Sequence, residues 1–410
     1  MEQPLAHVAA SESAAPGFFS NDPRFDAELL RRFDFDAALC LDQMRAIREN
    51  GTAQMVAQID DDFEVAERVT TVSYDGRSAE QLAHATGVQA LTRGEVAVLV
   101  LNGGLATRFG GVVKGTVPVF DDLSFLGAKI TDLIRAKSSF GKSVPLLIMN
   151  SFATRDETTI HLESNDYFGI DRENIRFFDQ SISVRLTEDG QPFFGSEGRA
   201  RYYAPGHGEF FQRLHVSGLF EDLARQGIRY LTFSNIDNLG ATLDPLLLGM
   251  HIASNCDMTV EVIRKTRNAS GAWDVGGAPI KVAGRLQIVE GFRFPASVPA
   301  EKLLDFQTNN MYFSLAALSE PPILPRYPIR KQVEGRGSIG FEAITCEASG
   351  VLRDNGEAWL SLNLLRVPRD GQRGRFYPIK SREDLELIRP QIKERLSSGW
   401  AIREREAGRW

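Results

Sequence analysis

The sequence predicts an α/β fold with a mostly parallel, doubly wound sheet and an N-terminal helical cap. From Glu95 onward, apolar runs of strand length alternate with amphipathic stretches of helix length, which indicates a sheet with helices on both faces. The first run, Val96 to Leu101, is continuously apolar, as a parallel strand is when both faces of its sheet are covered. With 410 residues, of which 43% are hydrophobic, the chain can bury one large core, and we expect one large domain with a smaller appendage.

The expected elements follow in order along the chain. Residues 1–22 predict a flexible tail, because SESAAPG and SNDP hold turn formers without periodicity. Residues 23–93 predict a helical region, because apolar side chains recur three and four positions apart. We expect one α/β domain over 94–390 and a C-terminal helix or tail over 391–410. Within the domain the pattern predicts strands at 96–101, 144–150, 174–179, 229–234 and 258–264, and helices near 125–138, 154–163, 208–226 and 244–254.

Composition argues against several classes of protein. The net charge of −7 disfavours a nucleic-acid partner, since such proteins usually carry a basic excess. Cys40, Cys256 and Cys346 lie far apart without a CxxC pair, so neither a disulfide framework nor a zinc site is indicated. An apolar run of about 18 residues and a signal-peptide pattern are both missing. We therefore expect a cytoplasmic protein without a membrane partner.

A glycine-rich loop, LNGGLATRFGG at 101–111, follows the first predicted strand. Its glycines are Gly103, Gly104, Gly110 and Gly111. Glycine allows positive φ and close backbone approach, so successive N–H groups can converge on a base edge or on phosphate oxygens. Arg108 and Lys114 add positive charge, in a spacing that fits neither the dinucleotide fingerprint nor the Walker loop. The loop therefore predicts a site for a nucleoside triphosphate in a different nucleotide-binding fold.

Polar residues follow several of the other predicted strands. Asn150, Gln180 and the segment from Asn235 to Asp237 each stand directly after such a strand. Ligands of open α/β sheets bind outside the carboxyl ends of the strands. We therefore expect these residues and the glycine loop to meet at one rim of the sheet.

The ordered motifs resemble the UDP-glucose pyrophosphorylase family, in its eukaryotic-type branch of sugar nucleotidyltransferases, from about Gly94 to about Arg389. The matching blocks are LNGGLATRFGG, KGTVPVFDDLSFL, PLLIMNSFATRDET, YAPGHGEFF, SNIDNLGATLDP, FQTNNMYFSL and RFYPIKSREDLELI. The resemblance implies a nucleotide-diphospho-sugar transferase type of fold, with the catalytic domain at 94–390. In the family a β-helix domain commonly follows, whereas here 30 residues remain after Lys380 and EDLELIRPQIKERL predicts a charged amphipathic helix. We expect no β-helix, and a monomer or small homo-oligomer.

The chemistry implied by the resemblance is attack of a sugar 1-phosphate oxygen on the α-phosphorus of a nucleoside triphosphate, with release of pyrophosphate. Positioning, cations and Mg²⁺ then stabilise the in-line transition state without a covalent intermediate. The resemblance implies Asp237 as the metal ligand, Arg108 and Lys114 at the β- and γ-phosphates, and Lys380 as a bridge between the sugar phosphate and the α-phosphate.

The remaining implied site residues divide into two groups. Those expected at the nucleotide are Leu101, Asn102, Gly103, Gly104, Gln180, Gly206 and His207. Those expected at the sugar phosphate are Asn235, Asn310 and Glu342. The Gln180 amide can read uracil, and guanine with a small shift, because it offers both a donor and an acceptor. Two departures from the family pattern stand in the loop: Lys114 follows the glycines one residue early, and Ala106 replaces a usual glycine.

Several functions remain open from the sequence. The default is UTP with glucose 1-phosphate. A guanylyl- or adenylyltransferase acting on a cyclitol or modified hexose 1-phosphate is the alternative, since GSIGFEAITCEASG around Glu342 departs from the family pattern. A glycosyltransferase is disfavoured because the chain has N-I-D-N where such enzymes typically have a D-x-D motif. A non-catalytic nucleotide-sugar sensor is disfavoured by the four charges at 108, 114, 237 and 380.

Overall fold

The structure of the chain is a computed structural model that describes residues 17–56, 58–60, 62–67, 69–106, 109–120, 123–267, 273–274, 276–379 and 381–393. It divides into two compact units, each assembled from three segments. The smaller unit contains Met1–Ala57, Ser181–Gly206 and Arg326–Glu342, and the larger unit contains Gln58–Gln180, His207–Pro325 and Ala343–Trp410. The region expected to be helical, residues 23–93, is therefore shared between the two units.

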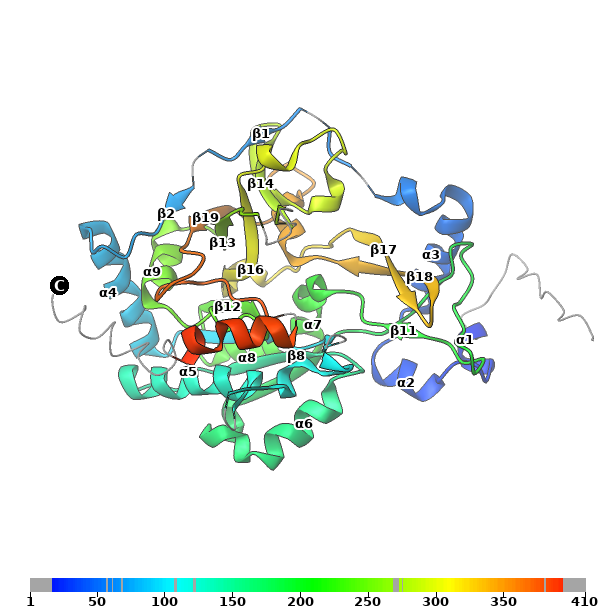
Figure 1. Ribbon diagram of the computed structural model, residues 1–410, viewed down its shortest axis with the longest axis horizontal. Helices are drawn as coiled ribbons and strands as arrows, with labels where there is room; N and C mark the ends of the chain where they lie inside the picture. Colours follow the sequence, from blue (N-terminus) through cyan, green and yellow to red (C-terminus); the bar gives the residue numbers. More distant parts are fainter. Residues whose placement is uncertain are drawn as a thin grey trace, which may run out of the picture. The chain divides into compact units, whose positions relative to one another are not determined.

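An eight-stranded sheet forms the centre of the larger unit (Figure 1). Its strands are β2 (Thr70–Thr71), β3 (Val96–Leu101), β8 (Leu146–Asn150), β9 (Ile175–Asp179), β12 (Tyr230–Asn235), β13 (Met258–Arg264), β16 (Asp305–Ser314) and β19 (Leu362–Arg366). They lie in the order β2-β19-β13-β16-β12-β3-β8-β9. Neighbours pair in parallel except at β16, which is antiparallel to both β12 and β13. The prediction of a mostly parallel sheet is confirmed.

Helices cover both faces of this sheet. They are α4 (Ser78–Arg93), α5 (Phe125–Phe140), α6 (Arg155–Ser164), α7 (Phe210–Val216), α8 (Leu219–Arg225) and α9 (Pro245–Ser254). Side chains alternate between the faces along a strand. Accordingly Val96 and Val100 of β3 pack in one buried cluster with side chains of α4, α5, α6 and α9. Ala97 and Leu99 pack in a second cluster with side chains of α7 and α8. The continuous apolar run is thus buried on both sides.

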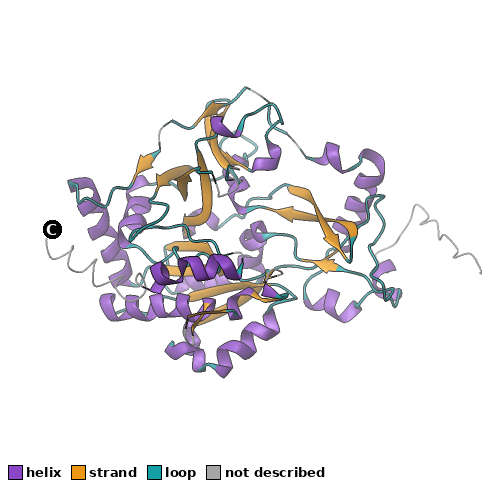
Figure 2. Cartoon of the chain, viewed as in Figure 1, coloured by secondary structure: helices purple, strands orange, loops and turns teal. Residues whose placement is uncertain are grey.

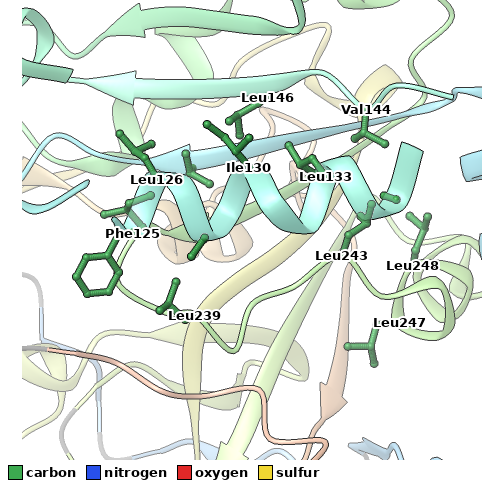
Figure 3. Close-up of a cluster of buried hydrophobic side chains, with 14 of the residues drawn as sticks. Phe125, Leu126, Ile130, Leu133, Val144, Leu146, Leu239, Leu243, Leu247 and Leu248 are labelled. Atoms are coloured by element: carbon green, nitrogen blue, oxygen red, sulfur yellow. The ribbon is translucent and has the colours of Figure 1, made fainter. Parts of the chain in front are cut away.

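Helix α5 shows how the sequence builds one of these layers. The Ser124 hydroxyl accepts a hydrogen bond from the Gly127 N–H at 3.1 Å and caps the start of the helix, and Gly141 ends it with a φ of 75°. Figure 3 shows apolar side chains along α5 facing the strand β8 and the segment that leads into α9. The labelled members are Phe125, Leu126, Ile130, Leu133, Val144, Leu146, Leu239, Leu243, Leu247 and Leu248.

Two glycines allow α4 and α9 to pack closely. A Cβ on Gly87 would lie 1.9 Å from the carbonyl oxygen of Pro245, and one on Gly249 would lie 1.6 Å from that of Ala83. No side chain fits at either position. The close approach buries the apolar residues that α9 presents to the sheet.

The elements expected between 96 and 264 are all present, with one difference. Instead of one long helix near 208–226, a short turn η6 (His207–Glu209) leads into α7, and α8 begins after Gly218. Gly218 has a φ of 73°, which an α-helix does not accommodate, so the backbone breaks there. Apolar periodicity continues across the break because both helices pack on the same face of the sheet.

Smaller elements surround the main sheet. Strands β1 (Glu64–Val65), β14 (Ala278–Val282) and β15 (Arg285–Val289) form an antiparallel sheet with its own apolar cluster. Two short antiparallel pairs, β4 (Leu105–Ala106) with β5 (Val112–Val113) and β6 (Pro118–Phe120) with β7 (Leu123–Ser124), follow β3. The 3₁₀ turns in the described part of this unit include, besides η6, η3 (Lys114–Thr116), η4 (Asp166–Gly169), η5 (Arg172–Asn174), η7 (Gly291–Arg293), η8 (Ala300–Lys302), η9 (Leu315–Leu318) and η10 (Thr345–Gly350).

The smaller unit combines N-terminal helices with two strand pairs. Its elements are α1 (Phe18–Asn21), α2 (Ala27–Arg32), α3 (Ala37–Asn50), η1 (Thr52–Met55), β10 (Ser183–Val184), β11 (Tyr202–Tyr203), β17 (Arg326–Val333) and β18 (Arg336–Ala343), the last reaching one residue beyond the unit. Strands β17 and β18 form the ribbon seen in Figure 2. Glu334 and Gly335 join them with φ values of 50° and 73°, which suit a tight hairpin turn. Backbone bonds Ile182 N–H to Phe33 O and Ala200 N–H to Arg24 O join the helices to the segment 181–206.

Candidate active site

The glycines of the loop after β3 differ in what their positions require. Gly110 and Gly111 have φ values of 91° and 81°, which other residues rarely adopt. Gly103 lacks positive φ, but a Cβ there would lie 2.3 Å from the side-chain oxygen of Gln180. Gly104 has neither constraint, because the space around it is open. Positive φ and close approach are thus used at different positions.

Asn102 fastens the glycine loop to the sheet. This fully buried residue follows Leu101, the last residue of β3. Its side-chain nitrogen donates to Asn150 at 3.0 Å and to the Thr158 hydroxyl at 2.8 Å, and its oxygen accepts from the Gly115 N–H at 3.1 Å. The Asn102 side chain therefore fixes the loop, and its predicted contact with the nucleotide stays a prediction.

Two amides lie where β8 and β9 end. The Gln180 N–H donates to the Asn150 carbonyl at 2.9 Å, and the Gln180 side chain lies against Gly103. Gln180 is 6% exposed, and its side-chain amide has no hydrogen-bond partner among the described residues. The side-chain nitrogen of Asn150 is also buried without a partner in the described part of the chain. Because unpaired buried amides are rare, this rim is suited to a polar, planar ligand.

Lys114 and Asp237 form an ion pair at the carboxyl end of the sheet. Lys114 opens η3, and Asp237 lies two residues beyond β12. The Lys114 ammonium donates to a carboxylate oxygen of Asp237. The two side chains are only 19% and 13% exposed, so salt screens their attraction less than it would at the surface. The structure thus brings together two of the four charges expected at the site.

The other two charges, Arg108 and Lys380, lie outside the described residues. The segment that precedes Lys380 is described. There, the Ile379 N–H donates to the Asp237 carbonyl at 3.3 Å. The chain neighbour of Lys380 therefore lies beside the Asp237 turn.

His207 lies at the start of η6, directly after Gly206, whose φ is 96°. Its ring nitrogen Nδ1 lies 2.7 Å from the Thr345 hydroxyl and accepts from the Thr345 N–H at 3.3 Å. Because Nδ1 is an acceptor, the neutral ring carries its proton on Nε2. A Cβ on Gly208 would lie 2.8 Å from the backbone of Ala343, so the turn packs tightly on this segment. The ring of His207 therefore has a fixed orientation and a donor at Nε2.

Asn235, Asn309 and Asn310 face different surroundings. Asn235, the last residue of β12, accepts from the Asn309 amide nitrogen at 2.7 Å. Asn309 has a φ of 60° and is 7% exposed, and its side-chain oxygen is buried without a partner in the described part of the chain. The Asn310 amide instead donates to Glu261 at 3.1 Å and accepts from Asn238 at 3.1 Å. Its predicted contact with the sugar phosphate stays a prediction, since this amide is occupied in a buried network.

Glu342 belongs to the smaller unit, on β18, where its carboxylate pairs with Lys331 at 2.7 Å. The larger unit holds another carboxylate near Asn309, which the sequence analysis did not single out. Glu290 accepts from the Gln307 amide at 3.3 Å, and the Gln307 oxygen accepts from the Asn309 N–H. The position of Glu290 directly after strand β15, which ends in the buried apolar residues Ile288 and Val289, is the signal that could have identified it.

The described residues limit what kind of metal site is possible. Over the ranges given above, no three His, Cys, Asp or Glu side chains gather around one point. Mg²⁺ commonly uses one or two carboxylates together with phosphate oxygens and water. Asp237 fits such a shared site, whereas a cage made entirely of protein ligands does not occur in this part of the chain. Within the same residues no helix is both long and apolar enough to span a bilayer.

The fold and the site define a class: α/β proteins that place a polar ligand site at the carboxyl ends of a mostly parallel sheet. The sequence model of one family, described as UTP–glucose-1-phosphate uridylyltransferase, matches residues 45–398. The chain belongs to this family.

Relatives by sequence agree with this assignment. UTP–glucose-1-phosphate uridylyltransferase of Solanum tuberosum is 33% identical over 324 residues, which cover 75% of this chain and 64% of the relative. The Saccharomyces cerevisiae protein of the same name is 31% identical over 323 residues, which cover 73% of this chain and 60% of the relative. The chain thus spans less than two thirds of the length of these relatives.

Crystal structures of other proteins share the fold. UDP-glucose phosphorylase of Trypanosoma brucei superposes with a TM-score of 0.70 at 24% identity, covering 88% of this chain and 77% of that chain. A variant of the Leishmania major UDP-glucose pyrophosphorylase in complex with UDP-glucose gives 0.66 at 22% identity, covering 91% and 78%.

Proposed function

We propose that the protein joins UTP to glucose 1-phosphate and releases pyrophosphate. The observation that carries the proposal is the Lys114–Asp237 pair, which stands beside the glycine loop at the carboxyl end of the sheet. Membership of the uridylyltransferase family supports the choice of substrates. An oxygen of the sugar phosphate attacks the α-phosphorus of UTP, a new P–O bond forms, and the bond to the leaving pyrophosphate breaks.

In this mechanism the protein positions two polyanions and neutralises their charge. Asp237 would hold Mg²⁺, which supplies charge neutralisation at the phosphates when it is bound. Lys114 and Arg108 bind the β- and γ-phosphates, so that pyrophosphate leaves with its charge compensated. Lys380 contacts the oxygens that gain charge in the transition state. The pairing of Lys114 with Asp237 holds both side chains in place before substrate binds.

Recognition of the base rests on Gln180 and the Gly103 backbone. The Gln180 amide presents a donor and an acceptor to the base edge, and Gly103 leaves room for that amide. His207 donates from Nε2 to a phosphate or to the ribose.

For the acceptor, the larger unit offers Asn235, Asn309 and Glu290. The side-chain oxygen of Asn309, which is buried without a partner among the described residues, accepts a hydrogen bond from a sugar hydroxyl. The Glu290 carboxylate is linked to Asn309 through the Gln307 side chain. The contacts of Asn310 and Glu342 with the sugar phosphate, which the family resemblance implies, stay predictions.

A pyrophosphate-release assay tests the proposal directly. Purified protein is offered UTP, GTP or ATP with glucose 1-phosphate or a cyclitol phosphate, with and without Mg²⁺. We expect release with UTP, glucose 1-phosphate and Mg²⁺, and a loss of turnover of at least about a hundredfold in Asp237→Ala. Asp222→Ala is the matched control, because Asp222 forms a surface pair with Arg225 on α8. Near-normal turnover of Asp237→Ala at saturating Mg²⁺ would contradict the assignment.

A further inference from the structure

The chain segment that leads to Lys380 is fastened to the Asp237 turn by one buried side chain, Asn238. Asn238 is 1% exposed, and its amide makes four hydrogen bonds. Its nitrogen donates to the Arg375 carbonyl at 3.0 Å and to Asn310 at 3.1 Å. Its oxygen accepts from the Tyr377 N–H at 2.9 Å and from the Gly240 N–H at 3.1 Å. This single amide therefore joins the turn after β12, strand β16 and the C-terminal segment.

Arg375 anchors the same segment to strand β13. Its guanidinium lies in a fork on Glu261 of β13, with nitrogen to oxygen distances of 3.0 and 2.6 Å, and donates to the Thr242 carbonyl at 2.9 Å. The two side chains are 2% and 0% exposed. Although burial disfavours its charge, the Glu261 carboxylate raises the pKa of Arg375 well above its ordinary value. A Cβ on Gly240 would lie 2.6 Å from the Arg375 backbone, so the turn and the segment touch directly.

A second buried cation, Lys129 of α5, holds the turn from the helix side. Its ammonium donates to the carbonyls of Asn238 at 2.9 Å and Ala241 at 2.8 Å. Burial lowers the pKa of Lys129 to about 7. The cavity between these groups measures about 20 Å³, which is room for about one water. Lys129 and Arg375 therefore hold the backbone around them through direct hydrogen bonds to its carbonyls.

Stability alone does not account for this arrangement. Buried ion pairs often contribute little net stability, because desolvation offsets much of their attraction, and packed apolar residues can replace them. A bidentate pair nevertheless fixes geometry, because the planar guanidinium allows one orientation on the carboxylate. Here the fixed geometry relates two backbone segments, one carrying Asp237 and the other leading to Lys380.

We propose that Asn238 and Arg375 are positioning residues, which hold the metal-binding turn and the segment leading to the reacting-phosphate lysine in a fixed mutual register. The inference rests on the proposed function for the roles of Asp237 and Lys380. It concerns residues that do not touch substrate, and it predicts that loosening the segment slows transfer more than it weakens binding of UTP. A misplacement of about 1 Å in a catalytic group can lower a rate by about a hundredfold.

The test compares three variants by kinetics and by amide hydrogen exchange. Arg375→Lys keeps the charge and loses the fork, and Asn238→Ala removes all four bonds. The matched control is Arg366→Lys, because Arg366 makes a similar fork on Asp305 of β16, at 3.0 and 2.7 Å, away from the Asp237 turn. Folding of each variant is followed by thermal unfolding.

We expect the Tyr377 and Ile379 amides to exchange at least about tenfold faster in Arg375→Lys and Asn238→Ala, and unchanged in the control. We expect kcat to fall about tenfold or more in both variants, with KM for UTP within about threefold of the wild type. Wild-type exchange at both amides, or an equal loss of kcat in Arg366→Lys, overturns the inference. If Arg375→Lys does not fold, Asn238→Ala decides. If the wild type releases no pyrophosphate, the proposed function fails, and the exchange comparison still decides whether these residues set the register.

Discussion

Replacing Gly103 by alanine tests how the glycine loop and Gln180 read the base. The added methyl carbon would lie 2.3 Å from the Gln180 side-chain oxygen, far inside van der Waals contact. The contacted oxygen lies at the far end of the flexible Gln180 side chain, so this side chain moves aside while the loop backbone keeps its position. The substitution therefore displaces the amide that we propose to contact the base edge, and it leaves unchanged the cationic side chains that we propose to bind the phosphates.

The expected size follows from the hydrogen bonds lost. Displacing the amide removes one or two bonds to the base, at about 1 to 3 kcal/mol in total, which is on the order of 5- to 150-fold in kcat/KM for UTP. The free energy of unfolding should change by less than about 1 kcal/mol, because Gly103 has no positive φ and the clash is with a mobile group.

The assay measures kcat/KM for UTP, CTP and GTP in Gly103→Ala and in Gly104→Ala. Gly104→Ala is the matched control, since its neighbourhood is open and its φ is not positive. We expect the control to behave as the wild type and Gly103→Ala to lose both UTP efficiency and preference for UTP. A normal UTP preference in a folded Gly103→Ala protein would refute the role of Gln180.

Three further outcomes are expected. Burial lowers the pKa of His251 to about 4, below its ordinary 6.5, so between these pH values the ring binds a proton only in the unfolded chain. The free energy of unfolding should therefore fall by up to about 3 kcal/mol as pH drops from 6.5 to 4. In His251→Gln, the free energy of unfolding measured with urea should depend less on pH over this range. Steady-state kinetics should show Lys380→Ala lowering kcat more than it raises either KM, and Arg108→Ala mainly raising KM for UTP; the reverse pattern would exchange their roles. Asn309→Ala should raise KM for glucose 1-phosphate about tenfold at unchanged KM for UTP, and an equal effect on both substrates would remove it from the acceptor site.

The parallel half of the fold was predictable because each strand is short, apolar and followed by polar residues. Val96 to Leu101 and the run before Asn150 are buried on both faces, so their composition alone identifies them. Strand β16 was not identified, because its sequence DFQTNNMYFS carries polar side chains that pair inside a buried network. Its antiparallel direction depends on tertiary pairing with β12 and β13, which no local pattern records.

In the candidate site, the meeting of one charged pair was predictable, and the polar contacts were less so. Lys114 and Asp237 meet as the strand-end rule requires. Between Asn309 and Asn310, sequence offers no distinction, since both are asparagines in one strand. Asn309 differs from Asn310 in its φ of 60°, and the Asn310 amide is hydrogen-bonded to Glu261 of the buried Glu261–Arg375 pair. Such facts arise from packing between distant segments, so they become visible only in the folded chain.

Phosphorus-31 NMR of a single reaction mixture tests nucleotidyl transfer directly, because it identifies which bonds form and break. Purified protein, UTP, glucose 1-phosphate and Mg²⁺ should yield the paired diphosphate signals of UDP-glucose together with pyrophosphate, as the sugar 1-phosphate signal disappears in equal measure. Adding pyrophosphate in excess should reverse the change. Inorganic phosphate with UDP, or UTP consumption that leaves the sugar 1-phosphate signal intact, would contradict nucleotidyl transfer and with it the roles given to Lys114 and Asp237.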